Sequence, residues 1–167
     1  GSFEILGIAS RNQITFPALR ASFSDLSGVP VETVLEFAQG LDWLQADKDG
    51  IVLVTTAGQR ILSLSTYETR LRRALLDYVE SERPAWLQAT TYGRTRLLSF
   101  AGTQVYQVFV EARLAEGTHD DVVEFWDELA ARARGHSNDR LLAIGREGEK
   151  LTLRHEKNRT GSEPKWI

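Results

Sequence analysis

The chain has 167 residues, enough for one ordinary domain or two small ones. Its hydrophobic share of 42% and charged share of 26% are typical of a globular protein and exclude an intrinsically disordered one. The net charge of −3, with His neutral, gives no overall attraction to nucleic acid, so a nucleic-acid site would need a local concentration of basic residues.

Cysteine and methionine are both absent. Without cysteine the chain has no disulfide, no thiolate nucleophile and no Cys-type zinc site. It contains no apolar run long enough for a membrane span and no secretory leader, so we expect a cytoplasmic protein with no membrane partner. The chain opens with Gly1-Ser2 in place of Met, which is typical of a cleaved tag, and we expect a fragment of a longer bacterial protein.

The first third of the sequence predicts a strand, two helices, a hairpin and a third helix. The strand is 14–16, and Pro17 suits the first turn of a helix that ends at Gly28. A second helix follows from Val31, with Val34 or Leu35 and Ala38 at helical spacing. Two strand-like runs, 43–45 and 51–54, flank an Asp-Gly turn signal, and Thr55 or Thr56 can cap a helix that begins at Ala57.

This order predicts a winged helix-turn-helix domain over 1–66, with a small β-hairpin as the wing. The phrase "GIVLVTTAGQRIL" resembles the passage from wing to last helix in many prokaryotic winged-helix domains. Winged helices contact DNA in some proteins and other proteins in others, so both functions stay open.

The charge of this region favours a protein-facing role. Residues 1–66 hold four basic and seven acidic residues, a net −3. The helix that would enter a major groove carries Glu32 and Glu36 and no Lys or Arg, and phosphates repel carboxylates. Thr33 and Gln39 are the remaining candidates for reading bases.

A helical block is predicted over 67–137, which makes the fold class mostly α. One helix carries Leu71 and Leu75 on its inner face and ends before Pro84. A second is predicted over 99–117. A third is predicted from Thr118, as its cap, to a stop at Gly135.

Aromatic and arginine residues are interleaved in this block. Trp86 and Tyr92 flank a polar stretch, and between Glu68 and Phe100 there are six arginines against four acidic residues. Such a cluster can stack on bases and hold phosphates, but the aromatic residues can equally be packing anchors and the arginines a solvated helix face. In a sharper form of the DNA hypothesis, Trp86, Tyr92 or Trp126 lines a cage around a methylated base. The candidate nucleic-acid-binding residues are Arg11, Thr33, Gln39, Lys48, Arg70, Arg73, Arg83, Trp86, Tyr92, Arg94 and Arg96.

A last helix is predicted in the segment 138–167, capped by Asn138 or Asp139. Leu141 and Ile144 lie on one of its faces. Gly145 and Gly148 each cost about 1 kcal/mol of helix stability relative to Ala. A glycine inside a helix usually has a packing reason, so we expect another element to approach this face closely.

The segment "IGREGEKLTLRHEKNRTGSEPKWI", together with "ERPAW…YGR…VVEFWDELAARAR", resembles the run-in to the prokaryotic NO VEIN C-terminal domain family. The resemblance covers about 67–167. It implies that a nuclease-like module follows in the longer protein, with an association to restriction or anti-phage defence. It also implies that Glu149 corresponds to the first-helix glutamate of such a module and that Glu156 and Arg159 lie on the same helix. The strand carboxylates and lysine that would hold Mg²⁺ are not in this sequence.

The sequence contains no recognisable set of catalytic residues. His119, His136 and His155 have no metal-ligand spacing, and no GxSxG, P-loop or GxGxxG motif occurs. We therefore expect no catalytic residue, metal or cofactor.

Two functions remain after these exclusions. One is a DNA-binding, or modified-DNA-reading, specificity domain of a restriction or anti-phage defence protein. The alternative is an interaction or assembly module that docks its own nuclease-like module or another defence subunit. Convergence of the candidate arginines on one surface would favour DNA.

Overall fold

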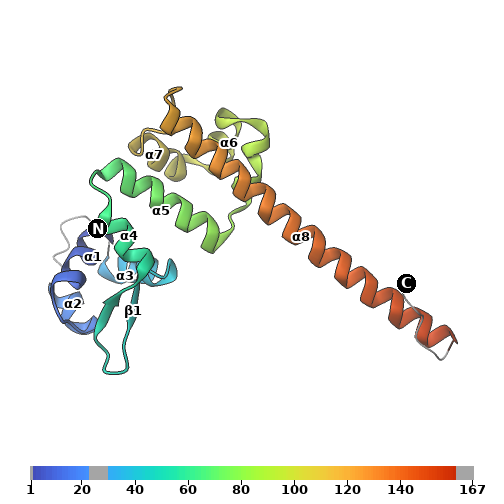
Figure 1. Ribbon diagram of the computed structural model, residues 1–167, viewed down its shortest axis with the longest axis horizontal. Coiled ribbons are helices and arrows are strands. Elements are labelled where there is room, and N and C mark those ends of the chain that lie inside the picture. The colour runs from blue at the N-terminus through green and yellow to red at the C-terminus, as the bar shows by residue number, and fades with distance from the viewer. Residues whose placement is uncertain (1, 23–29, 161–167) are drawn as a thin grey trace.

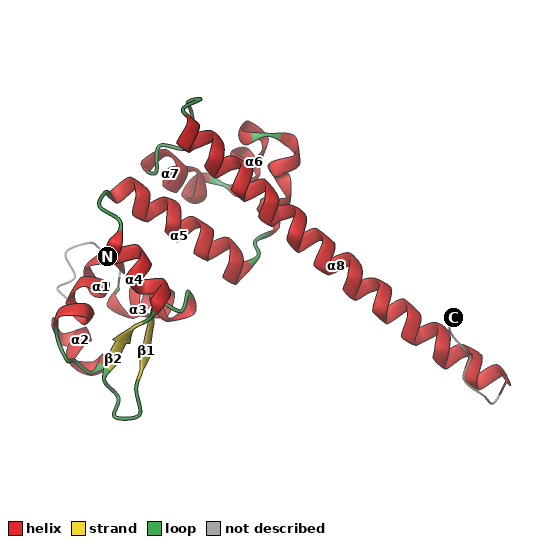
Figure 2. Cartoon of the chain, viewed as in Figure 1, coloured by secondary structure: helices red, strands yellow, loops and turns green. Residues whose placement is uncertain are grey.

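The computed structural model describes residues 2–22 and 30–160 (Figure 1). Over these ranges the chain is mostly helical and contains one two-stranded antiparallel sheet (Figure 2). The expectation of a mostly α fold with a small hairpin is confirmed.

The N-terminal part of the chain combines short helices with the hairpin. Its elements are α1 (Ser2–Arg11), α2 (Phe16–Ser22), α3 (Val31–Gly40), β1 (Leu44–Ala46), β2 (Val52–Val54) and α4 (Thr56–Ser63). The predictions missed α1, although its buried residues Ile5, Leu6 and Ala9 have helical spacing. The predicted end of the α2 helix at Gly28 lies outside the described residues.

The hairpin follows from its turn residues. Leu44 pairs with Val54, and the carboxylate of Asp47 accepts hydrogen bonds from the backbone N–H groups of Asp49 and Ile51. Gly50 has a φ of 80°, a conformation that strains other residues. The predicted strand 14–16 reduces to one bridge between Thr15 and Ile51, because the chain already turns into α2 at Phe16.

The helical block begins after α4. Its elements are α5 (Tyr67–Glu82), the 3₁₀ helix η1 (Ala85–Tyr92), α6 (Arg94–Ala101), α7 (Thr103–Glu111) and α8 (Asp120–Thr160). The stop of α5 before Pro84 is confirmed. The single helix predicted over 99–117 is wrong, because Gly102 takes a φ of 95° and separates α6 from α7.

Apolar side chains form two clusters that meet at α5. One cluster joins α1 to α4 and includes Ile5, Leu35 and Trp43. The other joins α5 to α8 and includes Phe109 and Leu129. Helix α5 serves both, since its Leu75 and Val79 belong to the second cluster while its Ala74 packs against the first.

The longest element is α8, a single helix of 41 residues. The predicted stop at Gly135 and the predicted cap at Asn138 or Asp139 are therefore wrong. A helical glycine costs about 1 kcal/mol, which neighbouring helix-forming residues can offset. Figure 1 shows the C-terminal half of α8 extending away from the rest of the molecule.

Candidate interaction site

The exposed face of α3 is acidic, as its sequence indicates. Val34, Leu35 and Ala38 point into the core, which leaves Glu32, Thr33, Glu36 and Gln39 exposed. The carboxylate of Glu32 lies 2.7 Å from the guanidinium of Arg20 on α2. Thr33 and Gln39 are thus accessible, as is Lys48 in the hairpin turn, but Glu32 and Glu36 accompany them on α3.

Two of the candidate arginines lie together. Arg11, at the end of α1, and Arg70, on α5, line one hollow together with Glu4 and Leu62. The guanidinium of Arg70 donates to the carbonyl oxygens of Leu62 and Leu64, at 3.2 and 2.9 Å, where α4 ends. Arg70 therefore satisfies carbonyl groups that the end of a helix leaves without intrahelical partners.

Arg73 takes part in a contact between the two apolar clusters. Its guanidinium lies 2.8 Å from one carboxylate oxygen of Asp77, and the indole N–H of Trp43 donates to the other at 2.9 Å. The side chains of Arg73 and Asp77 are 25% and 11% exposed, so this arginine is largely withdrawn from solvent.

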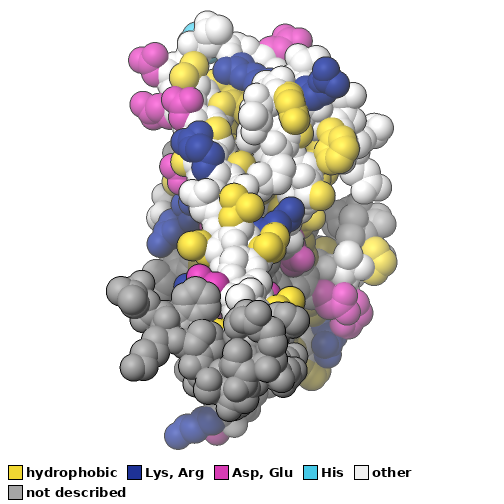
Figure 3. All heavy atoms as spheres, turned by 90° about the vertical axis from the view of Figure 1, so that its right-hand side faces the viewer, with side chains coloured by type: hydrophobic (Ala, Val, Ile, Leu, Met, Phe, Trp, Pro, Cys, Tyr) yellow, Lys and Arg dark blue, Asp and Glu magenta, His cyan; other side chains and the backbone are white. Residues whose placement is uncertain are grey.

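The remaining arginines lie at separate places. Arg83 ends α5 with a φ of 44° and approaches Asp139 at 3.7 Å. Arg94 donates to the carbonyl of Gly117 and lies 5.5 Å from the ring centroid of Trp126. Arg96 is exposed, and within the described chain it makes no ion pair. On the face in Figure 3, Lys and Arg side chains are separated by apolar and neutral atoms and do not form one basic patch.

The three aromatic residues of the proposed base cage do not converge. Trp86 and Trp126 are 8% and 9% exposed and belong to the apolar cluster of the helical block, where both lie near Phe109. The indole N–H of Trp126 donates to the carbonyl of Leu114. Tyr92 is 74% exposed, so the structure leaves it as a surface residue while the two tryptophans fill the core.

The described residues contain no group of three His, Asp or Glu side chains placed to hold a metal ion. His136 is the one described histidine with both ring nitrogens buried and without a hydrogen bond. Its Nε2 lies 3.6 Å from Glu80, which also receives the guanidinium of Arg132 at 2.6 Å. Burial raises the pKa of Glu80, but the hydrogen bond and positive charge of Arg132, with a smaller contribution from the nearby His136, outweigh burial, so the pKa lies below its ordinary value.

The arm, which we define as residues 138–153 of α8, was not among the candidate site residues. Every residue from 138 to 152 is exposed. Four apolar side chains stand out, Leu141, Leu142, Ile144 and Leu151, which are 63%, 59%, 61% and 61% exposed. Their spacing was visible in the sequence, but the sequence did not show that no other part of the described chain covers them.

The arm also carries a hollow beside these side chains. Asn138, Leu141, Leu142 and Gly145, at positions i, i+3, i+4 and i+7, line it together with the charged Arg146 and Glu149. This spacing is that of a hole that receives a side chain from a second helix. Apart from its chain neighbours and the surrounding backbone of α8 itself, no described atom lies within 4 Å of a Cβ placed on Gly145 or Gly148.

Among the described residues, no helix is both long and apolar enough to span a bilayer. No match to the chain is found among protein-family models, curated proteins or solved structures.

Proposed function

We propose that this chain is a protein-interaction or assembly module and that the arm is its docking element. The observation that carries the proposal is that three exposed apolar side chains, Leu141, Ile144 and Leu151, share one face of a helix that continues, unbroken, beyond the part packed in the helical block. Contiguous exposed apolar surface is typical of sites where another protein binds.

The stability of the arm supports this proposal. An isolated helix in water is marginal even when rich in alanine, and most helical stability in proteins comes from packing of an apolar face. The arm contains Gly145 and Gly148, each costing about 1 kcal/mol. Burial of Leu141 and Ile144 against a partner would contribute about 1.5–3 kcal/mol for each fully buried side chain, which offsets that cost.

The charges of the arm indicate the chemistry of the partner. Between 138 and 153 there are three acidic and three basic residues, a net charge of zero. A polyanion gains little from such a surface. An amphipathic helix or an apolar groove with mixed charges at its rim fits it better. From the resemblance to the NO VEIN family, we propose that this partner is a nuclease-like module or another defence subunit.

Site-specific photo-crosslinking in cells of the native host tests this proposal. A photoreactive residue at Leu141 should give a discrete adduct with another protein, and the same residue at the exposed Gln107 on α7 should not. Replacing Ile144 and Leu151 with Asp should abolish the adduct without changing the circular dichroism of the block. Equal crosslinking from positions 141 and 107 would contradict the proposal.

DNA binding by the N-terminal elements is the second candidate. The order α1, the Thr15 bridge, α2, α3, β1, β2 and α4 favours a winged helix-turn-helix, in which α3 would be the recognition helix and the hairpin the wing. The exposure of Thr33, Gln39 and Lys48 supports this candidate, while Glu32 and Glu36 oppose it.

Fluorescence anisotropy with plain and methylated duplexes at two salt concentrations separates the two functions. A DNA reader should bind with a Kd below about 100 μM, more weakly at higher salt, and Lys48→Ala should reduce the salt dependence. A docking module should bind both duplexes more weakly than that. Tight, salt-dependent binding lost in Gln39→Ala would favour the DNA function.

A further inference from the structure

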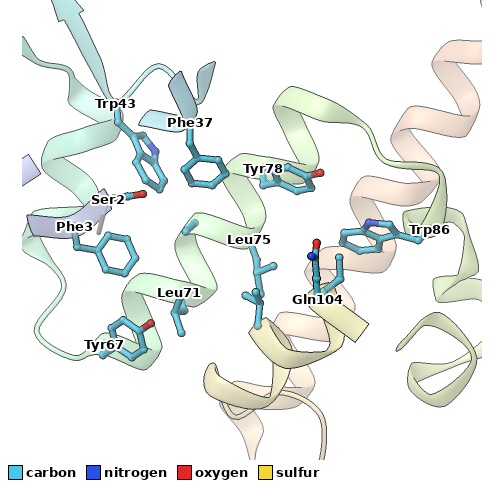
Figure 4. Close-up of a pocket in the computed structure, with 13 residues that line it drawn as sticks. Ser2, Phe3, Phe37, Trp43, Tyr67, Leu71, Leu75, Tyr78, Trp86 and Gln104 are labelled. Atoms are coloured by element: carbon cyan, nitrogen blue, oxygen red, sulfur yellow. The ribbon is translucent and has the colours of Figure 1, made fainter. Parts of the chain in front are cut away.

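A pocket of about 490 Å³ lies where α5 meets both apolar clusters (Figure 4). Its floor is one face of α5, formed by Tyr67, Leu71, Ala74 and Tyr78. The spacing of these residues, i, i+4, i+7 and i+11, places them in a row about 16 Å long. The pocket is therefore elongated, and its volume lies within the range of small-molecule sites.

Aromatic rings form one wall of the pocket. Phe37 stacks on Tyr78 with ring centroids 6.4 Å apart and meets Trp43 edge to face at 5.7 Å. Phe3 lies 6.2 Å from Trp43 and 6.0 Å from Tyr67. Figure 4 shows Phe3, Phe37, Trp43 and Tyr67 around one end of the pocket, with Tyr78 between them and Trp86. A flat ring placed there would gain stacked or edge-to-face contacts.

The lining is uncharged. Among the described residues that line the pocket, none is Asp, Glu, Lys, Arg or His. Two acids lie one hydrogen bond behind the lining. Both oxygens of Asp77 are engaged, one by Trp43 and one by Arg73, and Glu111 hydrogen-bonds to Tyr67, whose pKa is raised by burial and by this carboxylate. A charged ligand would lose its hydration here without gaining a counterion, and that loss is large for an ion.

Two hydrogen-bonding groups converge at the other end of the pocket. Figure 4 shows the side-chain amide of Gln104, on α7, and the hydroxyl of Tyr78 directed toward the same corner beside Trp86. Within the described chain, neither the Gln104 amide nor the Tyr78 hydroxyl makes a side-chain hydrogen bond. Polar groups of this kind orient a ligand within an otherwise apolar site.

We propose that this pocket binds an uncharged aromatic small molecule that carries one hydrogen-bonding group. The rings of Phe3, Phe37 and Trp43 hold the aromatic body, and the amide of Gln104 and the hydroxyl of Tyr78 bind the polar group. This site is distinct from the arm, because none of its lining residues lies on α8.

Two fluorescent probes that differ in charge test the proposal on the whole chain. N-phenyl-1-naphthylamine is uncharged, aromatic and carries one N–H donor, and 8-anilinonaphthalene-1-sulfonate adds a sulfonate to the same framework. We expect the neutral probe to bind with a Kd of about 10–50 μM. The sulfonate should bind at least about tenfold more weakly, because the pocket offers it no counterion. Equal affinity for the two probes, or a Kd of the neutral probe above about 200 μM, would overturn the proposal.

Variants of the lining locate the site. Gln104→Ala changes an exposed residue and removes the amide that would hydrogen-bond to the ligand, so it should weaken binding of the neutral probe about fivefold. Gln107→Ala, one turn further along α7, should leave that binding unchanged. Ala74→Phe places a large side chain in the floor of the pocket. If the variant keeps the native circular dichroism, it should bind the neutral probe more than tenfold more weakly. An affinity unchanged in Gln104→Ala overturns the proposal even if Ala74→Phe does not fold.

Discussion

The residue Gly58 illustrates how closely α4 and the hairpin are packed. A Cβ placed on Gly58 would lie 2.5 Å from the carbonyl oxygen of Trp43 and 2.7 Å from a methyl group of Val54. Thr55 fixes the same corner, since its side chain accepts a hydrogen bond from the N–H of Gly58 and its hydroxyl donates to the carbonyl of Asp42. Only a residue without a Cβ fits there, because the nearest atom belongs to the backbone.

We therefore expect Gly58→Ala to lower the free energy of unfolding by about 1–3 kcal/mol, although alanine is the better helix former. Gly40→Ala is the matched control, because no described atom outside its chain neighbours and the backbone of its own helix lies within 4 Å of its added Cβ. The control should leave stability unchanged or raise it slightly. Urea unfolding of the two variants measures the difference, and equal stabilities would show that the corner relaxes freely.

At the scale of the elements, ion pairs join α5 to α8 at two places. Arg72 on α5 lies 2.7 Å from Asp121 at the start of α8 and donates to the carbonyl of Ala112 at 2.9 Å. Arg132 on α8 lies 2.6 Å from Glu80 near the end of α5. The hydrogen bond from Arg72 lowers the pKa of Asp121, as Arg132 and His136 lower that of Glu80.

These shifts predict how stability depends on pH. A carboxylate whose pKa is lower in the folded than in the unfolded protein stabilises the fold above its ordinary pKa, and that contribution disappears as the pH falls through the folded pKa. For Glu80 the decline should begin near its ordinary value of 4.5. Glu80→Gln should thus be less stable than the parent at pH 7, with a difference that shrinks below pH 4.5.

Urea unfolding between pH 7 and pH 3 measures this difference. The exposed Glu124 on α8 provides the control, because Glu124→Gln removes no ion pair within the described chain and should follow the parent protein. A constant difference between Glu80→Gln and the parent at all pH values would exclude Glu80 as the source of the pH dependence.

At the scale of the whole molecule, the arm extends from a compact body that does not support it. Every residue from 138 to 152 is exposed, and within the described chain the ion pair between the arm and the block is that of Arg83 and Asp139 at 3.7 Å. An exposed pair of this kind contributes little to stability. The helical block and the arm should therefore respond separately to substitution.

Replacing Gly145 and Gly148 with Ala should separate helix stability from docking. The double variant should be more helical by circular dichroism, because each replacement stabilises an exposed helix by about 1 kcal/mol. It should also give less of the crosslinked adduct from position 141, because the added methyl groups keep a second helix from close approach. If adduct formation rises with helicity, the glycines have no part in docking.

Several features of the fold could be predicted because they depend on residues close in sequence. The Asp47–Gly50 turn, the cap at Thr55 and the end of α5 before Pro84 all follow from local hydrogen bonding or sterics. The breaks in the helices were less predictable. Gly102 interrupts a helix and Gly135 does not, although both are glycines in helical patterns, because the surrounding packing decides whether the chain turns.

The sequence by itself determined the mostly helical class, the hairpin and the acidic face of α3, since these depend on composition, on spacing and on neighbours a few residues apart. Only the tertiary structure decided what the arginines contact. Arg72 reaches the carbonyl of Ala112, and Asp77 joins Arg73 to Trp43, so these guanidinium groups are engaged within the protein. The same folding left the apolar face of the arm uncovered, because contacts between residues distant in the chain, which a local pattern does not specify, decide which charges are paired and which apolar surfaces remain exposed.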